Sequence, residues 1–167
     1  AVAPWPMIEE VIGAGAALGA ERVILSGQAR NVDGKVDAAG LSRKAAALNR
    51  AGAECAKRGM LLAYHNHDLE FRGGGEEMEQ LLRQTDAKSV GLMFDAGHAF
   101  VGGADSVRFF ERHHTRIHGM HLRDFKNGRQ VPLGQGEFNL AALEQTAAKT
   151  RWRGWIVAEE ERPNDVR

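Results

Sequence analysis

The stretch Gly91-Leu-Met-Phe-Asp-Ala-Gly-His98 decides the fold that we expect for this chain. Its first four residues are apolar on both faces and predict a short buried strand, as in a parallel sheet covered by helices. The strand ends at Asp95, and His98 follows after a glycine turn. Parallel α/β proteins build their active sites at such carboxyl ends of strands. A simpler interpretation is that Asp95 caps the next helix and that His98 is a turn residue.

The same kind of strand recurs along the chain, in alternation with helices. We expect polar loops between them, the longest at 28–40, 68–75 and 123–137. Five alternations are typical of βα units and predict an α/β fold with a parallel sheet, in a single domain over residues 1–167. The predicted strands are 21–26, 60–67, 91–95, 117–122 and 155–159, and the predicted helices are 7–18, 41–58, 76–83, 106–113 and 138–150.

Composition limits the classes of partner. The 22 basic residues balance the 22 acidic ones, which argues against nucleic-acid or anionic-membrane binding. The single Cys55 excludes an internal disulfide, and we expect a buried, inert thiol. No apolar run approaches the length of about 20 residues that spans a bilayer. The first six residues carry no signal peptide, although the chain does not begin with Met. We therefore expect a cytoplasmic location without a membrane partner.

Four successive strands each deliver one potential metal ligand near the carboxyl end. Because side chains alternate along a strand, the ligands converge on one point if their faces point inward. In strand 117–122 we expect Ile117 to share that face. Such a mixed nitrogen and oxygen set suits Mn²⁺, Co²⁺, Zn²⁺ or Fe²⁺, and Mg²⁺ less well, whereas unrelated polar strand ends are the alternative. The candidate ligands are His65, Asp95, His121 and Glu159.

Five segments of the chain resemble the xylose isomerase-like TIM-barrel superfamily. Within it, the sequence is similar to the sugar phosphate isomerases/epimerases, which include keto-sugar 3-epimerases and inosose dehydratases. The resemblance implies that the five units are the last five of an eight-stranded barrel, a fold of about 250 residues. We therefore expect a partial barrel, which is either a fragment of a longer protein or is completed by units from another chain. A fragment alone would be inactive, because it lacks the substrate residues of the first three strands. The segments are Tyr64-His-Asn-His-Asp-Leu-Glu-Phe71, Phe94-Asp-Ala-Gly-His98, His118-Gly-Met-His-Leu-Arg-Asp124, Leu133-Gly-Gln-Gly-Glu137 and Gly154-Trp-Ile-Val-Ala-Glu159.

The resemblance also implies a ligand set. In that family a divalent metal is held by a Glu, an Asp, a His and a second Glu, each on a different strand. Asp95, His121 and Glu159 match the last three in type. The position of the first Glu is His65 here, with Glu70 just beyond, so either residue is a candidate for the fourth ligand. A slip of one residue in the last strand would exchange Glu159 for its neighbour.

The chemistry expected of such a site is proton transfer next to a carbonyl. In the resembling epimerases the two metal-bound glutamates exchange the proton, which implicates Glu159 and Glu70. His98 and Arg123 are placed to hold substrate oxygens, since arginine offers a planar donor fork. His67 has two interpretations. It either orients a metal ligand or contacts the substrate, or it is a buried histidine whose hydrogen bonds are satisfied within the protein. We expect His118 to lie on the face away from the site and to have a structural role.

We therefore expect a metal-dependent isomerase or epimerase that acts on a keto-sugar or related polyol through a metal-bound enediolate. Loss of a β-hydroxyl instead would make it a sugar dehydratase. A repair endonuclease would need more His and Asp ligands and a basic surface. A non-catalytic scaffold or sugar-binding module is the third class, and the number of bound ions separates the three. The same reading allows a homo-oligomer.

Overall fold

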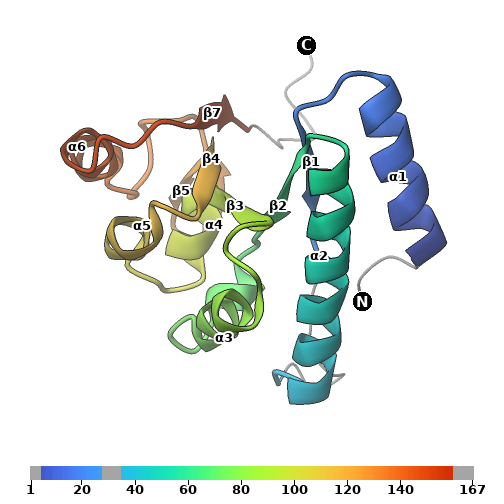
Figure 1. Cartoon of the computed structure of the whole chain (residues 1–167). Coiled ribbons are helices and arrows are strands. Elements are labelled where there is room, and N and C mark those ends of the chain that lie inside the picture. The colour runs from blue at the N-terminus through green and yellow to red at the C-terminus, as the bar shows by residue number, and fades with distance from the viewer. Residues whose placement is uncertain (1–4, 28–34, 160–167) are drawn as a thin grey trace, which may run out of the picture.

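The computed structural model describes residues 5–27 and 35–159, and its centre is a single curved sheet (Figure 1). Five strands lie in the order β1-β2-β3-β4-β7, and all neighbouring pairs are parallel. The parallel sheet predicted from the alternation of elements is therefore confirmed. The strands are β1 (Arg22–Leu25), β2 (Leu61–His65), β3 (Val90–Asp95), β4 (Ile117–Leu122) and β7 (Trp155–Ala158).

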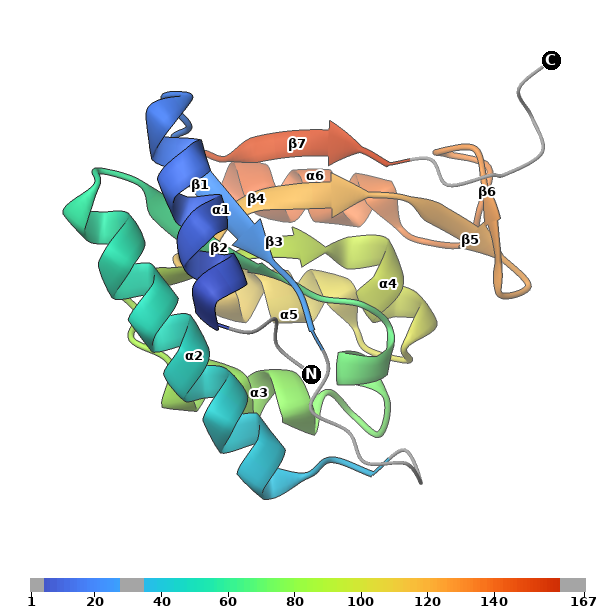
Figure 2. The same cartoon turned by 90° about the vertical axis from the view of Figure 1, so that its right-hand side faces the viewer.

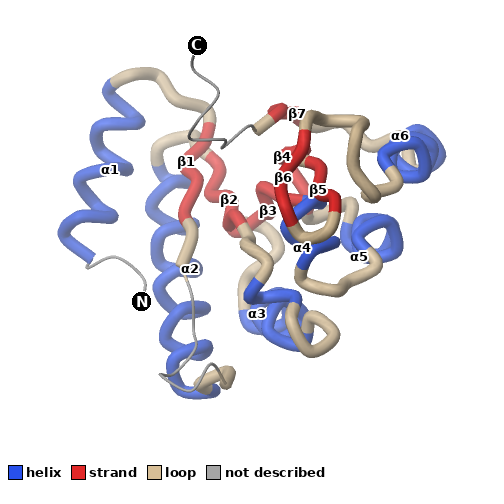
Figure 3. Tube along the Cα trace, turned by 180° about the vertical axis from the view of Figure 1, so that it is seen from behind, coloured by secondary structure: helices blue, strands red, loops and turns tan. Residues whose placement is uncertain are grey.

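Helices cover the convex side of this sheet, and the described residues leave its concave side open (Figures 1 and 3). Each covering helix precedes or connects parallel strands, as in a βα barrel. The arrangement is a half-barrel, which confirms the expected partial TIM-barrel fold. The covering helices are α1 (Trp5–Ala17), α2 (Ala38–Lys57), α3 (Glu76–Gln84), α5 (Ser106–His113) and α6 (Leu140–Lys149).

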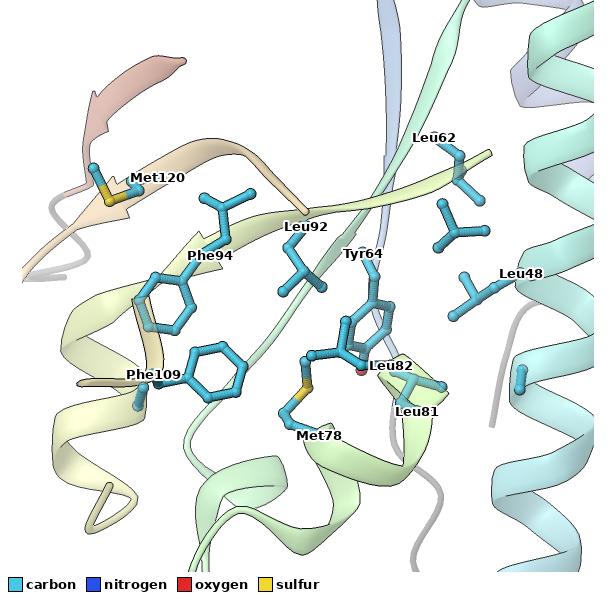
Figure 4. Packing of buried hydrophobic residues seen from close by; sticks show 14 of the residues in the cluster. Leu48, Leu62, Tyr64, Met78, Leu81, Leu82, Leu92, Phe94, Phe109 and Met120 are labelled. Atoms are coloured by element: carbon cyan, nitrogen blue, oxygen red, sulfur yellow. The ribbon is translucent and has the colours of Figure 1, made fainter. Parts of the chain in front are cut away.

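The hydrophobic core lies between the convex face and the helices (Figure 4). Alternate strand residues such as Leu62, Leu92 and Phe94 point into it, while the residues between them face the concave side. Helix α2 contributes the residues that its periodicity predicts, Cys55 among them, and burial raises the pKa of that thiol. Gly52 lets α2 approach the sheet, since a Cβ there would lie 2.5 Å from the Ser89 carbonyl oxygen.

Three short features depart from the expected turn after Asp95 and from two of the expected loops. Residues 96–101 are a helix, α4 (Ala96–Val101), and η1 (Leu69–Phe71) is a 3₁₀ turn within the expected loop 68–75. The expected loop 123–137 contains a hairpin of β5 (Asp124–Lys126) and β6 (Arg129–Val131). Asn127 and Gly128 at its turn have φ of 52° and 71°, the combination that two-residue hairpin turns require. Figure 2 places α4 and this hairpin beside the carboxyl ends of β3 and β4.

A bulge in β4 corrects the expected facing of two residues. Leu92 pairs with Ile117, but the next residue Met93 pairs with Gly119. Ile117 is therefore buried in the core with Leu92, not on the concave face. The extra residue, His118, lies on the concave side instead of away from it. This follows because a Cβ at Gly91, which faces the concave side, would lie 2.5 Å from the His118 ring.

Beyond the bulge, β4 regains the expected alternation, so Gly119 and His121 face the concave side as predicted. None of the described helices combines the length and the apolarity that crossing a membrane requires.

Candidate metal centre

The four side chains expected to bind a metal come together at the carboxyl edge of the sheet. One ligand atom from each lies within 4.8 Å of the other three. His65 and Asp95 end the neighbouring strands β2 and β3, His121 lies near the end of β4, and Glu159 follows β7. Such spacing fits four donors around one cation. The residues are His65, Asp95, His121 and Glu159.

Sheet register brings these ligands together. Asp95 is the direct partner of His121, and His121 is the direct partner of Val157, two residues before Glu159. The Glu159 N–H extends that pairing by donating to the Leu122 carbonyl oxygen at 3.0 Å. Directly paired residues of a parallel sheet point to the same face. The structure thus brings the four side chains together, with Glu159 at the position facing the site; Glu160 lies outside the described residues.

The donor set fits a divalent cation on two observations. First, His65 is 8% exposed, and its buried Nδ1 has no hydrogen-bond partner among the described residues. A buried ring nitrogen without a partner is costly unless something else occupies its lone pair or proton. Second, burial and the neighbouring His121 lower the pKa of His65 to about 4, so its ring is neutral and ready to ligate at pH 7. Two imidazoles with two carboxylates suit Zn²⁺, Co²⁺, Mn²⁺ or Fe²⁺.

Asp95 is both a helix cap and a member of the cluster. It is completely buried; its Oδ1 accepts the His98 N–H at 2.7 Å, which caps α4, and its Oδ2 accepts Arg123 Nε at 2.7 Å. The capping interpretation and the metal-site interpretation are therefore compatible. Burial raises the pKa of this carboxyl to about 7, although the His98 N–H and the Arg123 charge act in the opposite direction.

Glu159 closes the cluster from the side of β7. Its Oε2 contacts His121 Nδ1 and forms an ion pair with Arg123 Nη2 at 2.7 Å. The Glu159 side chain is 24% exposed, whereas the Arg123 side chain is 2% exposed. Arg123 thus lies at the site, as expected, but its guanidinium is bonded to two cluster carboxylates.

Two further histidines extend the cluster as a row of ring contacts. His67 lies 4.9 Å from the ring of His65, and His98 lies 5.2 Å from the ring of His67. Both side chains are partly exposed next to the cluster. Burial, followed by the Arg123 charge, lowers the pKa of His98 to about 4, so its ring is neutral at pH 7. Their place beside the cluster is the one expected for substrate-side residues.

The position of Glu70 contradicts the expectation that it joins the site. Its carboxylate is fully buried, where Oε1 accepts the Tyr64 hydroxyl and lies 3.5 Å from Lys44 Nζ. Tyr64 is a core residue of the convex face, so this carboxylate lies beneath the sheet while the ligands lie above it. Between the two candidates for the fourth ligand, His65 is the one in the cluster.

Asn66 positions Asp95, a role that no sequence motif predicted. Its side chain donates to the Asp95 carbonyl oxygen at 3.0 Å and accepts the Asp95 N–H at 2.9 Å. It thereby continues the pairing of β2 with β3 after the last backbone pair, His65 with Met93. A polar residue between two histidines just after a buried strand was the available signal.

The fold and the site define an α/β-barrel protein with a candidate metal centre at the carboxyl ends of its strands, and sequence comparison gives the family. The model described as "Xylose isomerase-like TIM barrel" matches residues 7–167. The chain belongs to this family.

Similar proteins come from both curated sequences and solved structures. An inosose dehydratase of Geobacillus thermodenitrificans is 25% identical over 174 residues, covering 86% of this chain and 58% of that protein. A sugar phosphate isomerase/epimerase structure from Parabacteroides distasonis has a TM-score of 0.77 at 24% identity, over 96% of this chain and 58% of that one. The IOLI protein, solved with a zinc atom, has a TM-score of 0.79 at 16% identity, over 95% and 60%. The chain thus spans less than two thirds of the length of these proteins.

Proposed function

We propose that this chain carries the metal centre of an enzyme that moves a proton on the carbon next to a carbonyl group of a keto-sugar or related polyol. The observation that supports it most is the cluster of two imidazoles and two carboxylates from four strands at one sheet edge. The named activities of the similar proteins, inosose dehydratase and sugar phosphate isomerase/epimerase, are of this general kind.

The residues divide the work as follows. His65, Asp95, His121 and Glu159 would hold the ion. When bound, a divalent ion supplies Lewis acidity, which lowers the pKa of a C–H bond beside a carbonyl. Glu159 is the residue that we propose as the proton acceptor, because its carboxylate is the more exposed of the two in the cluster.

His67 and His98 would hold the substrate. Both lie on the open side of the ligand cluster, and a neutral His98 ring can donate to one oxygen and accept from another hydroxyl. Sugar hydroxyls require such paired donors and acceptors. A neutral His98 ring also avoids adding positive charge to that of Arg123.

A dehydratase is the second candidate, and the position of Glu70 favours it. A two-base epimerase needs a second proton-transfer carboxylate on the opposite side of the substrate. Glu70 was the expected second residue, and it is buried beneath the sheet. In a dehydratase one base suffices: Glu159 would take the proton from the carbon next to the carbonyl and return it to the β-hydroxyl, which leaves as water.

Solvent deuterium exchange tests the proposal. The metal-loaded chain is incubated in D₂O with a panel of keto-sugars and an inosose, and proton NMR follows the carbon next to the carbonyl. We expect exchange that stops on chelation and on Glu159→Gln, and that survives in the control Glu79→Gln, which removes a distant carboxylate. Exchange in a product that keeps all the hydroxyl groups of the substrate indicates an isomerase or epimerase. A product with an enone that absorbs in the ultraviolet indicates a dehydratase. Exchange that persists without metal would contradict the proposal.

A further inference from the structure

The guanidinium of Arg123 lies between two strands that do not touch each other. Arg123 follows β4 directly, and β4 separates β3 from β7 in the sheet. Its Nε donates to Asp95 at the end of β3 at 2.7 Å, and its Nη2 reaches Glu159 after β7 at 2.7 Å. One side chain of the middle strand therefore fixes a carboxylate on either side of it.

The aliphatic part of the Arg123 side chain packs directly against Gly97 of α4. A Cβ at Gly97 would lie 2.5 Å from Arg123 Cγ and 2.4 Å from the Arg123 carbonyl oxygen. Only a residue without a side chain lets α4 approach Arg123 so closely. The arginine is 2% exposed and packed against α4, so it is a fixed part of the site and not an arm that reaches toward a substrate.

The charges explain why such a residue is useful. Asp95 and Glu159 are two carboxylates close together, and their repulsion would spread them apart without a cation between them. A guanidinium that bonds Asp95 through Nε and Glu159 through Nη2 offsets that repulsion and fixes the orientation of each carboxylate, leaving other lone pairs for an ion. Outer partners of this kind typically change metal affinity by 10–100-fold.

We infer that Arg123 is a positioning residue for the metal ligands: its fork holds Asp95 and Glu159 in place for the ion and does not bind the substrate. This inference rests on the proposed function only in treating the cluster as a metal site.

Metal affinity separates this role from the alternatives. The dissociation constant for Zn²⁺ is measured on the full chain, by competition with a chromophoric chelator, without any measurement of activity. We expect Arg123→Gln to weaken binding by about 10–100-fold. Arg123→Lys keeps the charge but loses the fork, so we expect it to weaken binding too. If the arginine acted only as a nearby positive charge, Arg123→Gln would tighten binding and Arg123→Lys would leave it unchanged.

Two further variants keep the test decisive. Gly97→Ala displaces the aliphatic part of the Arg123 side chain without changing any charge, and we expect it to weaken binding in the same direction. Arg22→Gln is the matched control, since Arg22 lies on the same sheet near the opposite end and donates to the His118 carbonyl oxygen; its affinity should equal that of the wild type. Circular dichroism checks that each variant is folded.

The two proposals fail in different ways. A wild-type chain that binds no divalent ion at the cluster would overturn the proposed function and this inference together. If the wild-type chain binds Zn²⁺ and the folded Arg123→Gln variant binds it equally tightly or more tightly, only the inference is overturned.

Discussion

Asp95 shows how one residue can meet two demands at a strand end. As a cap it satisfies the His98 N–H at the start of α4, and as a cluster member it faces His65 and His121. Its burial is what makes it an effective ligand, because a desolvated carboxylate gains most from a cation. The same burial makes its proton hard to remove when no ion is present.

We predict that metal binding releases more protons at pH 6 than at pH 8. With a pKa of about 7, Asp95 is mostly protonated at pH 6 and mostly ionised at pH 8, and an ion binds only the ionised form. His65, with a pKa of about 4, is already neutral at both values. Calorimetric titrations in two buffers of different ionisation enthalpy measure the proton count. Equal proton release at both pH values would show that Asp95 is not the titrating ligand.

Asn66 is expected to stabilise the junction of β2 and β3. Asn66→Ala leaves the buried N–H and carbonyl oxygen of Asp95 without partners, so we expect a loss of about 2 kcal/mol or more in the free energy of unfolding. Asn49 is the matched control: it also bonds two backbone groups, Gln84 and Asp86, but at the surface, where water can replace it. Urea unfolding of both variants decides the point, and equal losses would contradict the special role of Asn66.

At the scale of elements, a buried ionic network ties α2 to α3 and η1. Lys44 of α2 is 1% exposed and lies 3.3 Å from Glu77 of α3 and 3.5 Å from Glu70 of η1. Glu70 in turn accepts the His67 N–H at 3.1 Å. The network therefore also contacts the backbone of the loop after β2, from the convex side of the sheet. Burial lowers the pKa of Lys44, while the two carboxylates act to raise it.

Removing the cation from this network should be costly. Lys44→Met leaves two carboxylates buried together. We predict a loss of about 3–5 kcal/mol in the free energy of unfolding, because removing one partner of a buried ion pair leaves the other charge uncompensated. Lys57→Met, at an exposed pair with Glu54, should cost less than about 1 kcal/mol. Thermal and urea unfolding test both. A Lys44→Met variant as stable as the wild type would mean that the pairing contributes nothing.

Viewed as a whole molecule, much of this half-barrel was predictable from the spacing of a few residues. The alternation that starts from the Gly91–His98 stretch gives the parallel order, and its period of two selects Asp95, His121 and Glu159. The bulge at Ile117 and His118 was not predictable, because it depends on the register between two strands. Glu70 was misplaced because sequence distance says nothing about which side of a sheet a loop turns to. Asn66 was missed because its partners are backbone atoms of another strand.

The cluster also determines which parts of the molecule an ion would join. β2, β3, β4 and the residue after β7 contribute ligands, whereas β1 and α1 contribute none among the described residues. An ion at 100 times its dissociation constant would stabilise the fold by about 2.7 kcal/mol, through contacts among strands that are far apart in sequence.

The central claim is that one cation joins these four strand ends, and anomalous X-ray diffraction from crystals of the full chain grown with Zn²⁺ tests it most directly. We predict one strong peak per chain at the zinc edge, within bonding distance of His65, Asp95, His121 and Glu159, at about 2.0–2.2 Å from each ligand atom. A map in which the zinc lies elsewhere, or in which Asp95 and His121 point away from each other with no ion between them, would contradict the claim.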